Sequence, residues 1–316
     1  MSDNREDAGS FARRIRQFGD ESMQPRRNWM RVILVPVADR PECAVALHKA
    51  FSLGRELDAS VIGFHIRPPG DSPARSPSTH KLPAASGIDA EWHALIRRRG
   101  RKNTAPGARA LFARASQSAG YELHKSPRAK PGAMWLEKTG APSGIIGLHG
   151  PVSDLLVVSR PDSKDGSLAR LFMSAALMNS GRPILVLPQK DCGAIGKRIC
   201  IAWNQGAEAA RAVAAALPLL QLARHVTIAS AGPESRPGPK STHLVNYLKC
   251  WGVKAQRIAT RGNDPAKDLL GACRSSKSDV LVMGAYSRSR FSEMKYGEIT
   301  DFMLHRASIP VIMLHG

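Results

Sequence analysis

The chain alternates short, continuously apolar runs with longer segments whose apolar residues recur at helical spacing. Near its end, residues 279–284 and 309–314 are apolar and rich in Val, Ile and Leu, which is typical of strands buried on both faces of a parallel sheet. A Gly-bearing turn and a segment with roughly helical periodicity lie between them. We therefore predict a strand, a turn, a helix and a strand, and a right-handed crossover makes the two strands parallel neighbours.

The same unit occurs earlier in the chain, so the sequence contains an internal repeat. Each copy has an opening apolar strand, then Ser-Asp followed by a second apolar run, then a third run that contains Pro. The Pro lies 29 residues after the Asp in the first copy and 31 residues after it in the second. We interpret this as a tandem duplication of one α/β module. The matching segments are 31–36, 153–158 and 182–187 in the first copy and 198–203, 278–283 and 309–314 in the second.

The repeat predicts an α/β protein of two tandem modules, each a parallel sheet with helices on both faces. We assign residues 1–29 to a disordered tail, because they are polar and of mixed charge. Residues 30–190 form the first predicted module and residues 197–316 the second. The first module contains a Pro-, Ser- and Arg-rich insertion at about 68–130, with one helix candidate at 108–119.

The second module is the more regular copy. Asp264 and Pro265 predict the N-cap and the first position of a helix that ends near Ser275.

The net charge adds a second line of inference. The chain carries 46 Lys and Arg against 26 Asp and Glu, a formal charge of +20, which favours contact with nucleic acid, anionic lipid headgroups or nucleotide phosphates. Thirteen basic and four acidic residues lie between positions 67 and 130. One run there is a candidate polyanion contact: Arg97, Arg98, Arg99, Arg101 and Lys102. We favour a solvated loop as the alternative, because only Trp92 and Phe112 lie nearby and no aromatic residues are interleaved with these charges.

Patterns typical of catalytic and metal sites are missing from the sequence. The five cysteines form no Cys-x-x-Cys pair and are odd in number, which indicates a reducing compartment and argues against a zinc site or a disulfide framework. The ten histidines form no closely spaced pair of the metal-binding kind, and no Gly-x-Ser-x-Gly motif occurs. We therefore predict no catalytic and no metal-binding residues.

The cellular location is predicted from the absence of long apolar runs. No run approaches the length of a membrane-spanning helix, and the first 31 residues have no apolar core of signal-peptide length. We expect a cytoplasmic protein without a membrane span.

A ligand of an open parallel sheet binds beyond the carboxyl ends of the strands, where the strand order reverses. In the second module this places Asn204 beside the loop that runs from Gly284 through Ser287 to Gly297. Small residues before a helix start would expose backbone N–H groups to a phosphate. The plain alternative is that these glycines serve only a tight turn.

At this point the sequence resembles the universal stress protein family. The resemblance rests on 202–205, on 279–290, on Gly297-Glu-Ile-Thr300 and on 309–313, and it covers residues 31–66 and 133–316. It implies a five-stranded parallel sheet of order 3-2-1-4-5 in each module. It also implies a pseudo-dimer in which the two modules pair through their last strands. One branch of the family binds ATP through a Gly-x2-Gly-x9-Gly-Ser/Thr motif and an acidic residue after the first strand.

This sequence departs from that motif. Ser287 replaces the second Gly, Glu298 replaces the Ser/Thr, and Asn204 replaces the acid. A carboxylate at a helix N-terminus would repel a phosphate there. In the first module Asp39 stands where the acid is expected, but the loop 159–162 has no equivalent glycine, so we predict that this module has lost nucleotide binding. For the second module we leave open an altered nucleotide site and the loss of the site.

The resemblance implies a non-enzymatic stress-response or regulatory protein that binds ATP or another adenine nucleotide in its second module. The expected site residues are Asn204, Gly284, Ser287, Gly297 and Glu298. One alternative is a nucleic-acid or polyanion-binding protein that uses the basic insertion, and another is a slow ATP hydrolase. A homodimer in addition to the internal pairing is also an expectation.

Overall fold

A single sheet runs through both halves of the chain. The computed structural model describes residues 29–68, 86–99, 105–161, 166–235, 237–260, 262–285 and 297–315. Within them the strand order is β3-β4-β2-β1-β5-β6-β11-β10-β7-β8-β9. Nearly all of the predicted 1–29 tail lies outside the described residues.

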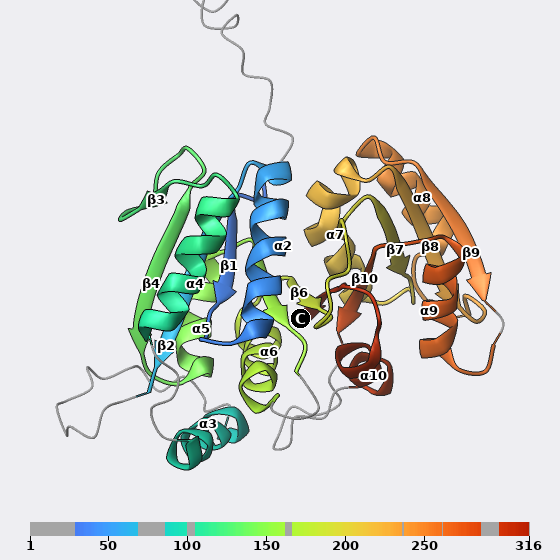
Figure 1. Ribbon diagram of the computed structural model, residues 1–316. Helices are drawn as coiled ribbons and strands as arrows, with labels where there is room; N and C mark the ends of the chain where they lie inside the picture. The colour runs from blue at the N-terminus through green and yellow to red at the C-terminus, as the bar shows by residue number, and fades with distance from the viewer. Residues whose placement is uncertain are drawn as a thin grey trace, which may run out of the picture.

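The first half supplies one wing of the sheet (Figure 1). Its strands are β1 (Val32–Pro36), β2 (Ser60–Arg67), β3 (Leu123–His124), β4 (Ala133–Thr139), β5 (Leu155–Ser159) and β6 (Ile184–Leu187). Its helices are α2 (Pro41–Leu57), α3 (Ser86–Arg99), α4 (Ala105–Ser118), α5 (Pro142–His149) and α6 (Ser167–Asn179), with a short 3-10 turn at Gly150–Val152.

The second half supplies the other wing. Its strands are β7 (Arg198–Ala202), β8 (His225–Ala231), β9 (Ala255–Thr260), β10 (Val280–Ala285) and β11 (Val311–His315). Its helices are α7 (Ala207–Leu222), α8 (Ser241–Cys250), α9 (Pro265–Ser275) and α10 (Glu298–Arg306).

Both halves have the predicted 3-2-1-4-5 order, and their last strands meet. The order is β4-β2-β1-β5-β6 in the first half and β9-β8-β7-β10-β11 in the second, with the short β3 added outside β4. Strands are parallel within each half, whereas β6 and β11 are antiparallel, with Val186 opposite Val311. The predicted pairing of the last strands is confirmed. In Figure 1 the arrowheads of β4 and β9, at the two flanks, point to the same side of the molecule.

The repeated Ser-Asp has a structural role that the sequence did not reveal. The Asp154 carboxylate accepts hydrogen bonds from the backbone N–H groups of Arg31 and Val32, at 2.7 and 2.9 Å. The Asp279 carboxylate does the same for Lys197 and Arg198, both at 2.9 Å. Each aspartate therefore holds the start of the first strand of its own half. This register makes Lys197 the equivalent of Arg31, one residue away from the match that the sequence motifs suggested.

The helix predicted within the insertion belongs to the module itself. α4 packs against α2, β2 and β4, and Phe112 is fully buried. Gly63 of β2 has no room for a side chain, because a Cβ there would lie 2.4 Å from the Phe112 ring. Figure 1 shows α2 and α4 side by side in front of the strands.

A second helix in this region, α3, was not predicted. Its residues Ile88, Trp92 and Leu95 are buried at helical spacing, and α3 packs against α5 and α6. Two polar contacts hold it there, from the Ser143 hydroxyl to Asp89 and from Arg170 to Glu91. The expectation of one helix between 68 and 130 was wrong, because an apolar face of only three residues is hard to distinguish in a Pro- and Arg-rich sequence.

An arginine of the first half terminates a helix of the second half. The Arg160 guanidinium, buried at the end of β5, donates to the backbone carbonyls of Leu304 (2.7 Å), Met303 (3.1 Å) and Ala307 at the C-terminus of α10. Burial lowers the pKa of Arg160 to about 10, so the side chain remains protonated at neutral pH. A cation suits this end of a helix, where carbonyls lack partners and the dipole is negative.

Candidate functional site

A cavity of about 670 Å³ opens at the carboxyl ends of β7, β8 and β10. Its walls are residues 202–209 after β7, residues 230–235 after β8, the first turn of α9, the end of β10 and the first turn of α10. This is the place where the strand order reverses between β7 and β10, as the sequence predicted for a ligand.

The loop after β7 is held in a fixed conformation. The Asn204 side-chain oxygen accepts a hydrogen bond from the Gly206 N–H at 3.0 Å, and Gln205 has a left-handed backbone with φ of 63°. Trp203 donates its indole N–H to the Pro239 carbonyl at 2.9 Å. Asn204 itself is exposed at the mouth of the cavity.

Gly284 is explained by close packing. A Cβ at this position would lie 2.5–2.6 Å from the backbone of Glu208 and Ala209, in the first turn of α7. The end of β10 therefore touches the start of α7, and this contact forms the floor of the cavity. The residue is part of β10 and has no left-handed φ, so it does not serve a tight turn.

Gly297 and Glu298 lie where the sequence placed them. Gly297 is the N-cap of α10, with an extended backbone, and Glu298 is the first residue of the helix. Both line the cavity together with Asn204 and Gly284, so four of the five predicted site residues come together. The fifth, Ser287, lies outside the described residues, as do Tyr286, Arg288 and Arg290.

Carboxylates stand at the starts of α7, α9 and α10, which line the cavity, and Glu234 of the cavity wall binds the start of α8. Glu208 is in the first turn of α7 and Glu298 in that of α10. Glu234 accepts hydrogen bonds from the Ser241 N–H at the start of α8 (3.0 Å) and from the Ser230 hydroxyl (2.9 Å). Asp264 is the N-cap of α9 and accepts from Ala266 (3.1 Å) and Lys267 (3.2 Å).

Two of these acids have lowered pKa values. Burial alone would raise the pKa of Glu234, but hydrogen bonds from Ser241 and Ser230 outweigh it and lower the pKa. The side-chain hydrogen bond from Lys267 is the largest cause of the lowered pKa of Asp264. Both groups are therefore ionised at neutral pH and complement the positive ends of their helices.

Sequence reasoning found only part of this arrangement. It identified Glu298 and the Asp264 cap, but missed Glu208 and Glu234. For Glu208 the available signal was an acidic residue in the first turn of a predicted helix, whereas Glu234 lies seven residues before α8 and gave no such signal. Among the described residues that line the cavity there is no Lys, Arg or His, so its wall is acidic.

The equivalent place in the first half is closed. Ser159 matches Gly284, five residues after the repeated Asp, and its hydroxyl donates to the Glu42 carbonyl at 2.7 Å. The cavity there is about 20 Å³, with Leu168 and Phe172 of α6 in its wall. α6 has 13 residues against 9 in α10, and the additional turn at its start carries Leu168.

Asp39, the acid predicted for the first half, packs against α4. An Asp39 carboxylate oxygen lies 2.0 Å from where a Cβ of Gly107 would be, so Asp39 packs against the first turn of α4.

The side chains of the predicted polyanion contact are not among those that the structure describes. Arg97, Arg98 and Arg99 end α3, but their side chains lie outside the description, and Arg101 and Lys102 lie beyond the described residues.

Among the side chains that are described, no group of three or more His, Cys, Asp or Glu residues could hold a metal ion. In the same part of the chain, every helix is too short or too polar to cross a membrane.

Comparisons with known proteins agree with this architecture. The family model described as the universal stress protein family matches residues 197–315. A universal stress protein from Archaeoglobus fulgidus is similar in structure at 15% identity, with a TM-score of 0.60, over 91% of this chain and 99% of that chain. A Pseudomonas aeruginosa protein provisionally given the same family name is 16% identical, with a TM-score of 0.50, over 92% and 94%. No curated protein matches the sequence.

These structural likenesses concern the fold, whereas the family match concerns the sequence of the second half. The 3-2-1-4-5 order of each half agrees with both findings. The second half of this chain is a universal stress protein domain, and the first half is a second copy of the same fold whose crevice has closed.

Proposed function

We propose that the chain is a non-enzymatic universal stress protein that binds one adenine nucleotide, in the crevice of its second half. The observation that carries the proposal is the difference between the two halves, a cavity of about 670 Å³ in the second and about 20 Å³ in the first. A pocket for a drug-sized ligand is commonly about 300–1,000 Å³, so the crevice of the second half has space for a nucleotide and the equivalent place in the first half does not.

The acidic wall determines how the nucleotide would bind. A phosphate chain at the start of α10 would meet Glu298, and one at the start of α7 would meet Glu208. We therefore assign most of the binding free energy to the adenosine part, with Asn204 bonding the sugar. The charge of the phosphates lowers the affinity, which makes ATP a weaker ligand than its size alone suggests.

Equilibrium titration with ATP and with adenosine tests this assignment. Glu298→Ser should tighten ATP binding by up to about fivefold, the equivalent of the 0.3–1 kcal/mol of a charge at a helix end, and change adenosine binding little. Asn204→Ala should weaken both ligands. Asp301→Ser is the matched control, because it removes the same charge from the first turn of α10 at a residue outside the cavity wall.

If neither the natural chain nor Glu298→Ser binds either ligand, the proposal is wrong. Equal tightening by Glu298→Ser and Asp301→Ser would show a general charge effect instead of a contact in the crevice. Prolonged incubation with ATP separates the hydrolase alternative, since we expect no ADP to accumulate above the buffer rate.

A further inference from the structure

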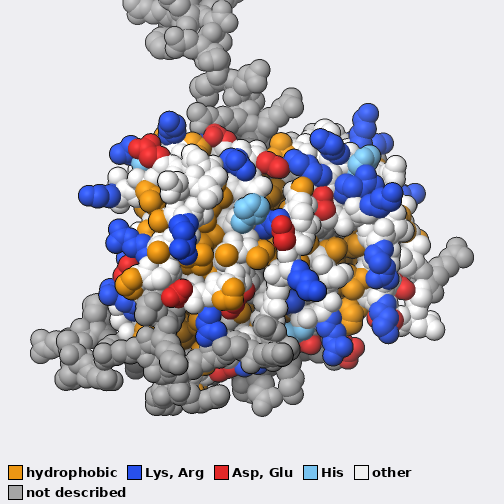
Figure 2. Space-filling model, viewed as in Figure 1, with side chains coloured by type: hydrophobic (Ala, Val, Ile, Leu, Met, Phe, Trp, Pro, Cys, Tyr) orange, Lys and Arg blue, Asp and Glu red, His pale blue; other side chains and the backbone are white. Residues whose placement is uncertain are grey.

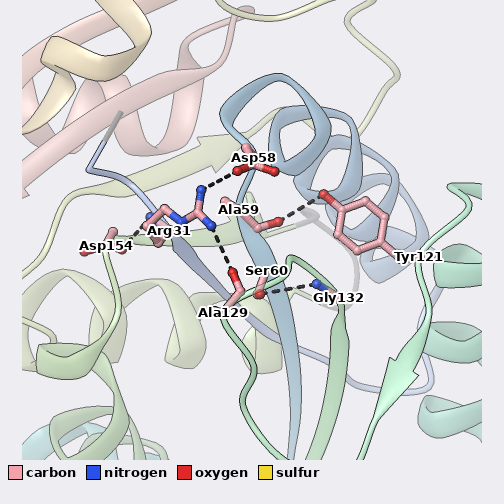
Figure 3. A network of polar contacts seen from close by, with 8 residues as sticks. All are labelled: Arg31, Asp58, Ala59, Ser60, Tyr121, Ala129, Gly132 and Asp154. Atoms are coloured by element: carbon pink, nitrogen blue, oxygen red, sulfur yellow. Dashed lines mark hydrogen bonds and ion pairs between the residues drawn. The ribbon is translucent and has the colours of Figure 1, made fainter. Parts of the chain in front are cut away.

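A second cavity lies at the opposite end of the strands, in the first half. It has a volume of about 230 Å³ and sits at the amino ends of β1, β2 and β4, under the segment 126–130 that precedes β4. Figure 3 shows its wall, where Arg31 lies between Asp58 and Ala129 and Ser60 bonds the Gly132 N–H at 3.3 Å. Six residues supply its polar lining: Arg31, Ser60, His124, Ser126, Arg128 and Lys130.

The lining of this cavity is basic. Arg31, Arg128 and Lys130 carry formal positive charges, and among the described residues in the wall there is no Asp or Glu. Three acids near the wall have partners, and one of them, Glu122, lies 3.9 Å from the His124 ring. Asp154 accepts two backbone N–H groups at the start of β1, and Asp58 pairs with Arg31. The cavity therefore has the opposite charge from the crevice of the second half.

The Arg31 side chain is held in position, and not all of its N–H donors are taken. One Nη donates to Asp58 and the other to the Ala129 carbonyl at 3.1 Å, so the plane of the guanidinium is fixed. A guanidinium has five N–H donors, and these two bonds leave three for a ligand. Arg128 and Lys130 are exposed and free to rotate toward the same point, and both belong to the basic excess between 67 and 130.

The other half shows what happens where such a site is absent. Lys197, the equivalent of Arg31, donates to the Glu56 carboxylate at 2.9 Å. The neighbouring Arg198 donates twice to the Ser276 carbonyl, at 3.0 and 2.8 Å. The basic groups at that position thus contact the protein itself. Among the residues that the structure describes, the β3 strand and the segment that follows it, which build the cavity in the first half, have no counterpart there.

We propose that this cavity is a binding site for a small phosphate-bearing anion of the diphosphate class. Arginine forks and ammonium groups are the donors that bind phosphate oxygens most strongly, and the Ser60 and Ser126 hydroxyls add neutral donors. A volume of about 230 Å³ is below the range for a drug-sized ligand, so the site fits a phosphate group and not a strand of nucleic acid. Arg31 orients the anion, and Arg128 and Lys130 close over it.

Calorimetric titration of the full chain with inorganic pyrophosphate at low salt tests the proposal. We expect one saturable site per chain. The double change Arg128→Ala and Lys130→Ala should weaken it about tenfold or more, because two charged contacts are lost and both residues are exposed, so the fold is retained. The matched control is Lys249→Ala with Lys254→Ala, which removes two exposed charges from the second half, where Figure 2 shows many basic side chains over the flank formed by α8, β9 and α9.

Three results would overturn the proposal. Pyrophosphate does not saturate; the control variant loses as much affinity as the cavity variant; or a single-stranded oligonucleotide binds more tightly than pyrophosphate through Arg128 and Lys130. The double change Arg128→Ala and Lys130→Ala should leave adenosine binding unchanged, because the crevice lies in the other half and at the other end of the strands. Failure of this site and failure of the nucleotide site are therefore separate observations.

Discussion

Single carboxylates in this chain act on backbone N–H groups that would otherwise lack a partner. Glu234 satisfies the start of α8, Asp264 the start of α9, and Asp154 the start of β1. Of these three carboxylates, Glu234 lines the crevice, where its charge also repels an anionic ligand. Local stability and phosphate affinity therefore oppose each other at Glu234.

The lowered pKa of Glu234 predicts a pH-dependent contribution to stability. A carboxyl group whose pKa is lower in the folded than in the unfolded state stabilises the fold at pH values above its unfolded-state pKa. This stabilisation is lost as the pH falls through the folded-state pKa. The difference in unfolding free energy between the natural chain and Glu234→Gln should be largest at neutral pH and should decrease below a pH of about 4.5. Urea unfolding across this range measures it, and a difference independent of pH would contradict the assignment.

Asp154 gives a second test at the scale of one residue. Asp154→Ala leaves two N–H groups at the start of β1 without their acceptor, so we expect a loss of about 1–3 kcal/mol in unfolding free energy. Asp154→Asn keeps one side-chain oxygen and should lose less. Equal losses in the two variants would mean that the charge, and not the hydrogen bonds, is what matters.

Helices differ between the halves more than strands do. The strands of both halves follow one order, whereas α6 has an additional turn and the described part of the second half has no counterpart of α3. α3 bonds Ser143 in the first turn of α5 and Arg170 in the first turn of α6. The matching helix starts in the second half, those of α9 and α10, line the open crevice. The open and closed crevices thus result from changes in helices on a constant sheet.

Trp92 tests whether α3 is a packed element. Its side chain is fully buried, so Trp92→Ala should lower the unfolding free energy by about 3–5 kcal/mol. His93→Ala changes an exposed residue of the same helix and should stay within about 0.5 kcal/mol. Urea unfolding of both variants is the measurement. A neutral Trp92→Ala would show that α3 does not pack on α5 and α6 in solution.

Across the whole molecule, the two halves support each other. β6 and β11 join the sheets, Arg160 caps α10 from the other half, and Lys49 of α2 donates to the Gly193 carbonyl in the connection between the halves. Because α10 starts at the crevice and ends at Arg160, the first half fixes one wall of the second half's site without touching a ligand.

Arg160→Met tests this support. The variant keeps the apolar stem but loses the three bonds to α10, so we expect at least about 1.5–3 kcal/mol lower stability, the range for one hydrogen bond to a charged group. Amide hydrogen exchange should be faster at the C-terminal end of α10. Arg182→Met is the control, since Arg182 is exposed and bonds the Pro151 carbonyl of its own half. Unchanged exchange in Arg160→Met would contradict the coupling.

The sequence predicted the elements whose signal is local. α9 has the predicted bounds, because Asp264 with Pro265 marks a helix start, and β6 (Ile184–Leu187) lies within the predicted apolar run 182–187. α3 and β3 were missed, since one has a narrow apolar face and the other is two residues long.

The site was predicted in the same partial way. The reversal of the strand order pointed to Asn204, and the motif of the family that the sequence resembles pointed to Glu298. Glu208 and Glu234 were not found, because their place in the cavity depends on helix starts that meet only in three dimensions.

The joint between β6 and β11 also limits how far the sheet can grow. Within the described residues, its remaining borders are β3, two residues long, and β9, which carries the exposed Arg257. At the first border β3 pairs with only Ala133 and Met134, so no described strand pairs with residues 135–139 of β4 on that side. At the other border a strand added by another copy would have to desolvate the Arg257 guanidinium, so we expect strand addition to favour β4 over β9.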